Sequence, residues 1–506
     1  MKKLLFTFLF VSFLGIGYAQ KVIKVDAPFP MRELVVPQFA DKDFVITDFG
    51  AKQDDQGSCS KAVKSAIEAC SKNGGGRVVI PSGHWLTGPI HLKSNIDLHL
   101  AENAVLKFSD TPEDYLPVVF TRYGGYECYN YSPLVYAIDC ENIAVTGKGT
   151  LDGNGQKWWA WTKPKEKLPV YTMVLDNVPV EKRIFGKPEF ALRPSFIQFI
   201  RCENVLFEDF TVTSGPFWTV HPVYCNNVIA RKINVITRGS NNDGFDIDSS
   251  SDVLIEDCFF DTEDDCLVLK SGENEDGWRV GKPTENVVIR NIRTKMGNGG
   301  VVFGSEMSGG IRNVYVHDCF FDGTDRGIRM KSVRGRGGYI ENIWINNIGM
   351  KNIIRDVLLI DMFYKATMLP ATQTPSVFRD IFIQNIFCEK SNGVFTISGL
   401  PDKSAENIQL KNVCVMSAQK GASCNDVKDL LLDGIYMNTT DSIAWRMNNV
   451  RDIQIKNLTF AGSSKTFMEV KGKSSNISID HTTLPYVEKI VSEPEAGLSV
   501  VKISNE

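Results

Sequence analysis

The chain has 506 residues, and its 56 basic side chains nearly balance its 60 acidic ones, which leaves a formal net charge of -4 at pH 7. So small a charge excludes the global field that draws nucleic acid or an anionic membrane surface to a protein. A hydrophobic content of 43% is enough for a large core. Any attraction for a charged ligand must therefore be local, and we expect no nucleic acid as a partner.

The first residues, MKKLLFTFLFVSFLGIGYAQ, join two lysines to an apolar run from Leu4 to Ile16 and end in small residues. This layout is typical of a secretory signal, and we expect a signal peptide over residues 1–19 with cleavage after Ala19. The run is too short to span a bilayer, and no later stretch reaches about 18 uninterrupted apolar residues. We therefore expect an exported protein, periplasmic or extracellular, without membrane insertion.

Residues 20–45 are predicted to form an N-terminal extension, and residues 46–506 a single domain. Near the start of this domain, the segment SKAVKSAIEAC from Ser60 has apolar residues at helical spacing. They are Ala62, Ala66, Ile67 and Cys70. We expect a short amphipathic helix that covers the N-terminal end of the domain.

The twelve cysteines are scattered singly, with no CxxC pair. An exported chain can form disulfides, but a redox or metal site would need closely spaced cysteines. Half of the cysteines sit in apolar strand-like runs, where cysteine usually serves as a small core residue. These six are Cys202, Cys258, Cys266, Cys319, Cys388 and Cys414. We expect no metal and no cofactor.

From Glu141 onward one short phrase recurs: a polar residue, then Asn or Asp, then alternating aliphatic and polar residues. It appears as ENIAV, ENVLF, NNVIA, SDVLI, ENVVI, RNVYV, ENIWI, RDIFI, ENIQL, KDLLL, RDIQI and SNISI. Between Asn204 and Asn476 the Asn or Asp positions are 22 to 38 residues apart. Each period holds two or three short strands of alternating polarity, with turn residues between them.

Strands this short cannot bury an apolar face alone, but stacking coil on coil lets each strand pair in parallel with its copies above and below. The sequence therefore predicts an all-β fold, a right-handed parallel β-helix of about a dozen coils. A β-propeller is the alternative, but it would need periods of about 40 to 50 residues and antiparallel blades.

Residues 241–266, NNDGFDIDSSSDVLIEDCFFDTEDDC, are dense in aspartate. One strand of each central coil can be aligned here, at residues 245–247, 267–269, 301–303 and 328–330. Alternation along these strands turns one set of side chains inward: Phe245, Ile247, Leu267, Leu269, Val301, Phe303, Ile328 and Met330. The other set then points outward: Asp246, Asp248, Val268, Lys270, Val302, Arg329 and Lys331.

Just before these strands, on the same edge, sit Asp243, the pair Asp264 and Asp265, and Asn298. Adjacent coils lie about 4.8 Å apart, so these residues form one patch roughly 15 Å long. Three carboxylates this close cannot all ionise cheaply, so one pKa should be raised while another stays low. Such a split supplies the acid and the base for hydrolysis of a glycosidic bond, with inversion if they are about 6.5 to 9.5 Å apart.

Arg329 and Lys331 project the same way, one coil beyond Asn298. Arginine can bind a carboxylate through two hydrogen bonds, and lysine acts as a point charge, so a sugar acid is a more natural ligand than a neutral sugar. A surface salt bridge to nearby aspartates is the alternative. Glu306 either contacts substrate or merely ends a strand.

Aromatic segments lie before the acidic region. In GPFWTVHPV, from Gly215, Trp218 is predicted to stack on a sugar and His221 to donate to a sugar hydroxyl, or else both are part of the core. The loop TRYGGYECYNYSPL from Thr121 and the insertion 163–193 are expected to wall off one end of a cleft. Such walls would favour cutting from a chain end.

Four of these segments resemble the signature motifs of glycoside hydrolase family 28, which holds polygalacturonases, exo-galacturonidases and rhamnogalacturonan hydrolases that cut pectin. They are NNDGFD at 241–246, EDDC at 263–266, GNGGVVFGSE at 297–306 and RGIRMKS at 326–332. The segments ITDFGAK, GGGRVVIPSG and LTGPIHLKSNIDLHL resemble the family's N-terminal coils. The likeness runs from about Ile46 to at least Lys331.

The resemblance implies a role for each matching residue. Asp264 matches the general acid, and Asp243 and Asp265 match the carboxylates that activate the attacking water in single-displacement inversion. Arg329 and Lys331 match the pair that binds substrate carboxylates near the cleavage point. Further substrate contacts are assigned to Asn241, Asp246, Asn298, Glu306, Trp218 and His221.

One position departs from the family. Where the third motif usually reads Gly-His-Gly, this chain has Asn298 between two glycines. Asn can donate a hydrogen bond to Asp264 or to a sugar hydroxyl, but it does not titrate near neutral pH. Two readings follow: a working glycosidase with a shifted pH profile or altered linkage preference, or a weakened enzyme that mainly binds.

We therefore predict an inverting hydrolase of α-galacturonosidic bonds in pectic polysaccharide or oligosaccharide. Three alternatives stay open: a rhamnogalacturonan-directed hydrolase of the same family, a pectate-type lyase with calcium on the clustered aspartates, and a non-catalytic carbohydrate-binding β-helix. The number of subunits is not predicted.

Overall fold

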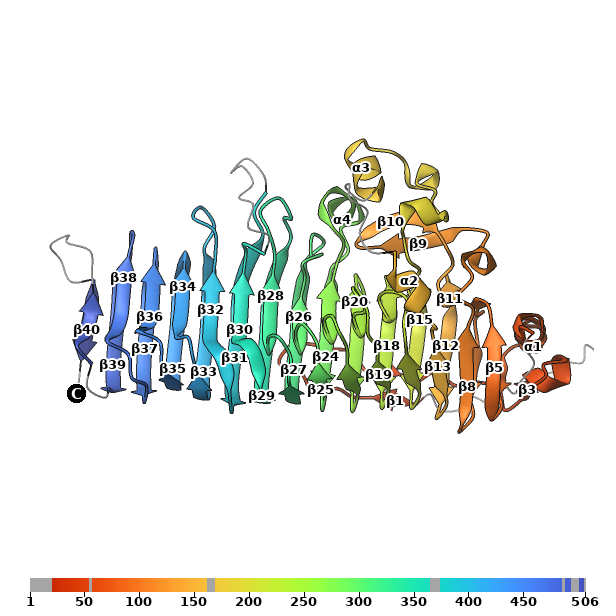
Figure 1. Cartoon of the computed structure of the whole chain (residues 1–506), viewed down its shortest axis with the longest axis horizontal. Helices are drawn as coiled ribbons and strands as arrows, with labels where there is room; N and C mark the ends of the chain where they lie inside the picture. Colours follow the sequence, from red (N-terminus) through yellow and green to blue (C-terminus); the bar gives the residue numbers. More distant parts are fainter. Residues whose placement is uncertain are drawn as a thin grey trace, which may run out of the picture.

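The computed structural model describes residues 21–53, 57–161, 169–364, 374–484, 487–492 and 500–504. The predicted signal peptide, residues 1–19, lies outside this part. Most strands belong to two long parallel sheets that run side by side along an elongated solenoid (Figure 1). This confirms the predicted right-handed parallel β-helix.

The smaller sheet, here called sheet I, has 14 strands and carries the aligned central strands. Its strands are β6 (Ile90–His91), β11 (Val135–Ile138), β14 (Ile197–Ile200), β17 (Val220–Val223), β20 (Phe245–Asp248), β23 (Leu267–Lys270), β26 (Val301–Phe303), β28 (Ile328–Lys331), β30 (Ile353–Asp361), β32 (Ser391–Ser398), β34 (Ala422–Asn425), β36 (Ile443–Asn448), β38 (Thr466–Lys471) and β40 (Lys489–Ser492).

The larger sheet, sheet II, has 23 strands. They are β3 (Asp43–Val45), β4 (Gly76–Ile80), β5 (Gly83–Thr87), β7 (Ile96–Leu100), β8 (Ala104–Phe108), β12 (Glu141–Gly147), β13 (Thr150–Asp152), β15 (Glu203–Glu208), β16 (Thr211–Thr213), β18 (Asn226–Arg231), β19 (Asn234–Ile236), β21 (Ser251–Glu256), β22 (Phe259–Asp261), β24 (Thr284–Arg290), β25 (Arg293–Met296), β27 (Ile311–Asp322), β29 (Tyr339–Lys351), β31 (Val377–Cys388), β33 (Ala405–Ala418), β35 (Val427–Thr439), β37 (Arg451–Phe460), β39 (Ser475–Thr483) and β41 (Val501–Ser504). Early coils contribute two short strands to this sheet, and later coils contribute one long strand.

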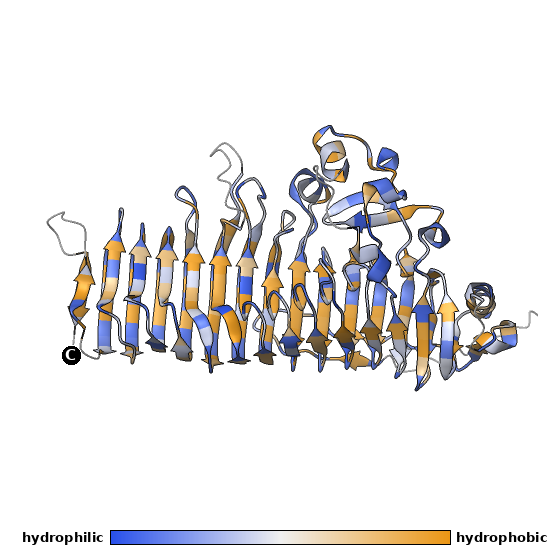
Figure 2. Ribbon diagram, viewed as in Figure 1, coloured by the Kyte–Doolittle hydropathy of each residue, from blue (hydrophilic) through white to orange (hydrophobic). Residues whose placement is uncertain are grey.

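The apolar core is one continuous cluster from Phe44 to Val501. All eight side chains that alternation turned inward in the central strands belong to this cluster, as predicted. Apolar bands recur on successive strands along the whole solenoid (Figure 2). Because each coil covers the apolar face of the next, strands of three to six residues become stable.

The recurring Asn or Asp has a structural reason. All twelve of these residues have positive φ, between 50° and 57°, a left-handed conformation that Asn and Asp tolerate better than most residues. Their side chains also hydrogen-bond from coil to coil: Asn227 Nδ2 donates to Asn204 Oδ1 at 2.8 Å, and Asn313 Nδ2 donates to Asn286 Oδ1 at 3.1 Å. We call this corner the Asn ladder. It turns the chain and fixes the register of neighbouring coils.

The N-terminal end of the solenoid is covered by helix α1 (Ser60–Lys72), which buries the predicted apolar residues against β3, β4, β6 and β7. This confirms the predicted capping helix. The other helices are α2 (Gln156–Trp159), α3 (Pro169–Leu175), α4 (Asn274–Val280) and 3-10 helices at Ile46–Phe49, Pro112–Tyr115, Val180–Lys182 and Pro188–Phe190.

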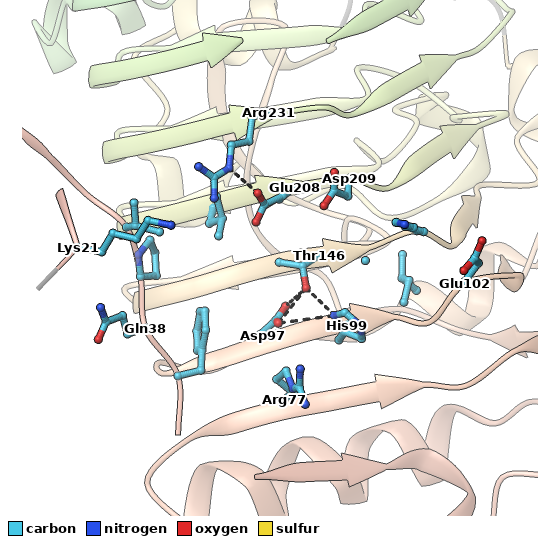
Figure 3. A pocket seen from close by; sticks show the side chains of 17 residues that line it. Lys21, Gln38, Arg77, Asp97, His99, Glu102, Thr146, Glu208, Asp209 and Arg231 are labelled. Atoms are coloured by element: carbon cyan, nitrogen blue, oxygen red, sulfur yellow. Dashed lines mark hydrogen bonds and ion pairs between the residues drawn. The ribbon is translucent and has the colours of Figure 1, made fainter. Parts of the chain in front are cut away.

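Residues 21–39, here called the strap, cross the outer face of sheet II. The strap contains β1 (Val22–Ile23) and β2 (Leu34–Val35), and its apolar side chains pack on Leu206, Ile229 and Leu254. Beside it, a cavity of about 600 Å³ is lined by mixed charges (Figure 3). Burial raises the pKa of Asp97 in this cavity to about 6, although Thr146 donates to its carboxylate.

A wall rises over the N-terminal coils of sheet I. It is made of the hairpin β9 (Val119–Tyr123) and β10 (Tyr126–Asn130) together with α3 and α4 (Figure 1). Arg183 binds Asp276 of α4 at 2.9 Å, and the backbone N–H of Glu127 donates to Asp276 at 2.8 Å. The buried Arg122 of β9 pairs with Asp248 of sheet I at 3.3 Å, so the hairpin is anchored to the solenoid.

All twelve cysteines are free thiols, and ten of them are buried. Burial raises the pKa of most of these thiols, for example to about 12 for Cys258. Among the described residues, no helix is long and apolar enough to cross a membrane.

The Asn ladder can be tested at Asn227, which also binds the strap through the N–H and the carbonyl of Val35, at 3.0 and 2.8 Å. Asn227→Ala should destabilise the protein by about 2 to 3 kcal/mol, because it removes these hydrogen bonds and adds left-handed strain. Asn227→Gly should cost about 1 kcal/mol less, because glycine adopts positive φ without strain. Urea unfolding midpoints measure both, and equal midpoints would contradict a left-handed requirement at this corner.

Candidate active site

The candidate site lies on the outer face of sheet I, where β20, β23, β26 and β28 run side by side. The strands pair in register, so that Asp246, Val268, Val302 and Arg329 form one row across four coils. Asp248 and Lys270 form the next row. The predicted alternation therefore holds, and residues far apart in sequence meet on one face.

Three carboxylates gather at the edge of these strands. Asp243 lies just before β20, and Asp264 and Asp265 lie just before β23. Each offers an oxygen, and these three oxygens lie within 4.8 Å of one another. The backbone N–H of Gly244 donates to the Asp265 carbonyl at 2.9 Å, which fixes the two turns against each other. The predicted convergence of the acids is therefore observed.

Asp243 is paired with a lysine beneath it. It is 3% exposed, and Lys270 Nζ donates to its Oδ2 at 3.0 Å. Burial raises the pKa of Asp243 to about 7; Lys270 lowers it, but Asp264 and Asp265 raise it further. One carboxyl pKa is therefore raised, as predicted, but burial is the main cause and the neighbouring carboxylates only add to it.

Lys270 contacts two more carboxylates. Its Nζ lies 3.3 Å from Asp246 Oδ1 and 3.4 Å from Glu306 Oε2, and 3.6 Å above the centre of the Trp218 ring. Burial alone would lower the pKa of Lys270, but Asp243, Glu306 and Asp246 raise it well above the usual value. Lys270 is therefore a permanent buried cation among three acids.

Asp265 has a lysine of its own. It is 1% exposed, and Lys331 Nζ donates to Asp265 Oδ2 at 2.7 Å. Arg329 Nη1 lies 3.9 Å from Asp265 Oδ1, and the ring of Tyr364 faces both cations, at 5.3 Å from Arg329 and 5.2 Å from Lys331. Burial alone would lower the pKa of Lys331, but Asp265 raises it.

Asp264 differs from both neighbours because its partners are neutral. It is more exposed than Asp243 or Asp265. Its Oδ1 accepts hydrogen bonds from Asn298 Nδ2 at 2.9 Å and from the backbone N–H of Asp265 at 3.0 Å. The predicted contact between Asn298 and Asp264 is therefore confirmed.

Glu306 and Asp246 lie below the open surface. Burial alone would raise the pKa of Glu306, but Lys270, Arg336 and Lys331 lower it to about 2, so Glu306 is ionised. Asp246 is 0% exposed, and neither carboxylate oxygen has a hydrogen-bond partner among the described residues. Burial, and then Asp243, raises the pKa of Asp246 well above the usual value. The prediction that Asp246 contacts substrate does not fit this burial.

Two other predicted substrate contacts, His221 and Trp218, also turn inward, whereas Asn241 is half-buried. His221 is 0% exposed; it lies 2.8 Å from Gln198 Nε2 and 3.4 Å from Asp248 Oδ2. Trp218 is 3% exposed, and its ring is covered by Phe217 and by Lys270. The open alternative, that both residues are packed inside the protein, describes them better. Asn241 accepts a hydrogen bond from Arg193 Nη2 at 3.0 Å.

Among the described residues, the three aspartates are the one acidic group whose geometry could hold a cation. Two of the three are already neutralised, by Lys270 and by Lys331. A divalent ion would have to displace these ammonium groups or share the carboxylates with them. The donor set therefore suits acid–base chemistry better than cation binding.

Sequence reasoning missed the roles of Lys270 and Tyr364. Lys270 was placed on the outward face, but its long side chain runs back to Asp243 in the neighbouring coil. Lys270 pairs with Asp248 of the neighbouring strand, and this register, which the aligned strands already implied, places the lysine close to the acidic coil. Tyr364 follows β30, and no pattern in the sequence placed it against Arg329.

A parallel β-helix with three carboxylates and two cations on one outer face is the arrangement of a polysaccharide-cleaving glycosidase. The family model for glycosyl hydrolases family 28 matches residues 186–435, which include every site residue named above. Relatives agree. A probable polygalacturonase of Vitis vinifera is 29% identical over 408 residues, which are 76% of this chain and 77% of that protein.

The exo-poly-alpha-D-galacturonosidase of Dickeya chrysanthemi is 27% identical over 452 residues, which are 82% of this chain and 74% of that protein. The crystal structure of a hyperthermoactive exopolygalacturonase from Thermotoga maritima is 40% identical, with a TM-score of 0.72 over 79% of this chain and 94% of that one. The chain therefore belongs to glycosyl hydrolases family 28 and is a glycoside hydrolase.

Proposed function

We propose that the protein hydrolyses α-galacturonosidic bonds in pectic polysaccharide or oligosaccharide, with Asp264 as general acid and Asp243 and Asp265 as the carboxylates that activate water. Two relatives are named as galacturonosidases that act from a chain end, and a third as a probable polygalacturonase. Residues 1–19 read as a secretory signal, and export would bring the enzyme to an extracellular polymer.

The observation that carries this assignment is the unequal choice of partners around the three acids. Asp243 and Asp265 each accept a hydrogen bond from a lysine, at 3.0 and 2.7 Å, and an ammonium donor opposes the protonation of a base. At Asp243 the lysine offsets only part of the effect of burial, so the pKa of Asp243 is about 7. Asp264 has only neutral donors, Asn298 and a backbone N–H. A carboxylic acid can keep its second oxygen protonated while its first accepts both bonds, and that proton is available to a leaving oxygen.

Water activation by Asp243 and Asp265 implies inversion at the anomeric carbon. The oxygens of the three acids approach within 4.8 Å, closer than the separation of about 6.5 to 9.5 Å usual for inverting pairs. However, the family resemblance implies single displacement, and Asp243 and Asp265 are close enough to hold one water between them. In this arrangement both carboxylates bind one water, and Asp264, which lies beside them, protonates the leaving oxygen.

The substrate carboxylate would bind at Arg329 and Lys331. Arg329 is 8% exposed, and its Nε has no hydrogen-bond partner in the described part of the chain. This nitrogen is itself buried, so a bound uronate carboxylate would pair with the outer Nη atoms of the guanidinium, of which Nη1 lies 3.9 Å from Asp265 Oδ1. Tyr364 lies against both cations and offers a ring face to the sugar.

The wall supports attack from a chain end. The tip of the β9–β10 hairpin reaches the site: the backbone N–H of Glu273 donates to the Gly125 carbonyl at 3.3 Å, and a Cβ built on Gly125 would lie 3.2 Å from Glu306 Cγ. A polymer that follows sheet I past Asp243 toward the N-terminal coils would meet this hairpin. In the opposite direction, over β28 and beyond, the described part of the chain has loops but no helix or separate hairpin.

Asp264→Asn should lower kcat by about 100- to 10,000-fold, because it removes the proton donor to the leaving oxygen. Affinity for galacturonate oligomers should survive, because Arg329 and Lys331 are untouched. Initial rates and calorimetric binding measure the two effects, with the exposed Asp48→Asn as matched control. Equal activity of wild type and Asp264→Asn would refute the assignment, and an inactive wild type that binds oligomers would favour a binding protein.

The acid limb of kcat/KM should lie near pH 7, because the pKa of Asp243 is about 7 and its carboxylate must be ionised to act as a base. Lowering the pH protonates Asp243, so activity should fall about tenfold per unit below pH 6. Initial rates on a galacturonate trimer between pH 4 and pH 9 measure this limb. A rate that stays flat from pH 5 to pH 7 would show that Asp243 is not the titrating base.

A digest of defined galacturonate hexamers should release one short product from the start, with the β configuration at the new reducing end. Chromatography over time and NMR of the first product measure these outcomes. A ladder of intermediate sizes would contradict attack from a chain end, and an α product would contradict inversion. Cleavage only of rhamnogalacturonan oligomers would move the substrate to that polymer, and an ultraviolet-absorbing product sensitive to chelator would indicate a lyase.

A further inference from the structure

The proposed reaction assigns no role to Lys270, although this lysine lies among the carboxylates of the site. It is the last residue of β23, two coils from Lys331, and only 3% exposed. Its side chain lies beneath the acids, so it contacts carboxylates but has no open surface for a substrate. A buried ammonium needs a reason, because removing it from water is costly unless it is paired.

The ammonium joins three coils. Asp243 and Asp246 come from the coil before Lys270 and Glu306 from the coil after it, at 3.0, 3.3 and 3.4 Å. Three acids thus share one cation, and the nearest of them is Asp243. Asp243 accepts a hydrogen bond from Lys270 Nζ at 3.0 Å, the shortest of the three contacts.

Trp218 completes this arrangement. Its ring face lies 3.6 Å from Lys270 Nζ, close enough for a strong cation–π contact between two buried side chains. The ring is itself held between Phe217, at 5.2 Å, and His221, at 4.8 Å. The position of the ammonium is therefore set on one side by an aromatic platform and on the other by carboxylates.

We propose that Lys270 is a positioning residue that aims the Asp243 carboxylate at the attacking water and keeps it ionised, with Trp218 as its platform and Glu306 as the competing anion. The proposal rests on the proposed role of Asp243. It gives Trp218 and Glu306 functions that act through Lys270 rather than through contact with sugar.

Other charged groups face this pair and enter any pH dependence. Around Asp243 they are Asp246, Asp264, Asp265, Lys331 and Arg193. Behind Lys270 they are His221 and Asp248 of the preceding coils and Glu306 of the next. Of all these groups, Lys270 is the cation in direct contact with Asp243, so its removal should dominate.

Removal of the cation Lys270 and removal of the anion Glu306 should shift the pH dependence in opposite directions. Lys270→Met should move the acid limb of kcat/KM upward by about 1 to 3 pH units, because an opposite charge this close lowers a carboxyl pKa by that amount. Glu306→Gln should move it downward by about half a unit or more, because a nearby anion disappears while Lys270 stays. Lys270→Arg should return the limb toward that of the wild type, and Trp218→Leu should shift it in the direction of Lys270→Met.

The pH dependence of kcat/KM on a galacturonate trimer measures these shifts, with the exposed strand residue Lys107→Met as matched control. Circular dichroism checks folding, and oligomer affinity should be unchanged in Lys270→Met because Lys270 does not reach the substrate. Mere loss of structure cannot move two limbs in opposite directions. Limbs of Lys270→Met and Glu306→Gln that coincide with the wild type, or move the same way, would overturn the proposal.

A second readout separates this inference from the proposed function. The ionisation of Asp243 can be followed by carboxyl carbon NMR without substrate, with Asp243→Asn to assign the signal. An upward shift of this titration in Lys270→Met supports the inference even if no pectic oligomer is cut. An unchanged titration overturns it even if the wild type is a fully active galacturonosidase.

Discussion

Hydrogen bonds between Asn and Asp side chains at one corner of successive coils set the register on which everything else in this protein depends. The bond from Asn227 to Asn204 and its copies align many of the coils on their neighbours, while left-handed φ at the same residues turns the chain toward the next strand. A slip of one residue would exchange the inward and outward faces. Because the register holds, Phe245 and Leu267 enter the core and Asp246 and Lys270 face outward.

The register alone places the charges, and their pairing then divides the work among three chemically identical acids. Two aspartates accept hydrogen bonds from lysines and one accepts a hydrogen bond from an amide, so three identical side chains have different charged surroundings. Asn298 is informative in this respect: a titratable or charged donor in its place would change the environment of Asp264 with pH, whereas an amide does not. The departure from the family pattern thus gives Asp264 a neighbour that donates a hydrogen bond and does not titrate.

Periodicity made the solenoid predictable, because a repeated Asn or Asp and period-two alternation both follow from local backbone geometry. The capping helix followed from helical spacing, and the convergence of Asp243, Asp264 and Asp265 from the spacing between coils. The burial of His221 and Trp218 did not follow, because it depends on the hairpin and insertion that cover them. Nor did the contact of Lys270, whose four-carbon side chain can reach any of several coils.

Charge recognition is concentrated where the bond would be cut. Beyond Lys331 the outward row continues with Asp361, Ser398, Asn425 and Asn448, and the row of Arg329 continues with Leu359, Thr396 and Ser423 before Arg446, which binds Asp441. Thus, in the described strands of sheet I, four coils past the site offer no unpaired cation to a polyanion. Binding free energy that is gained next to the scissile bond can be used to orient it, whereas energy gained far along the chain would mainly slow product release. A short cationic tract between a wall and a neutral surface therefore suits an enzyme that engages one or two charged sugars at a time.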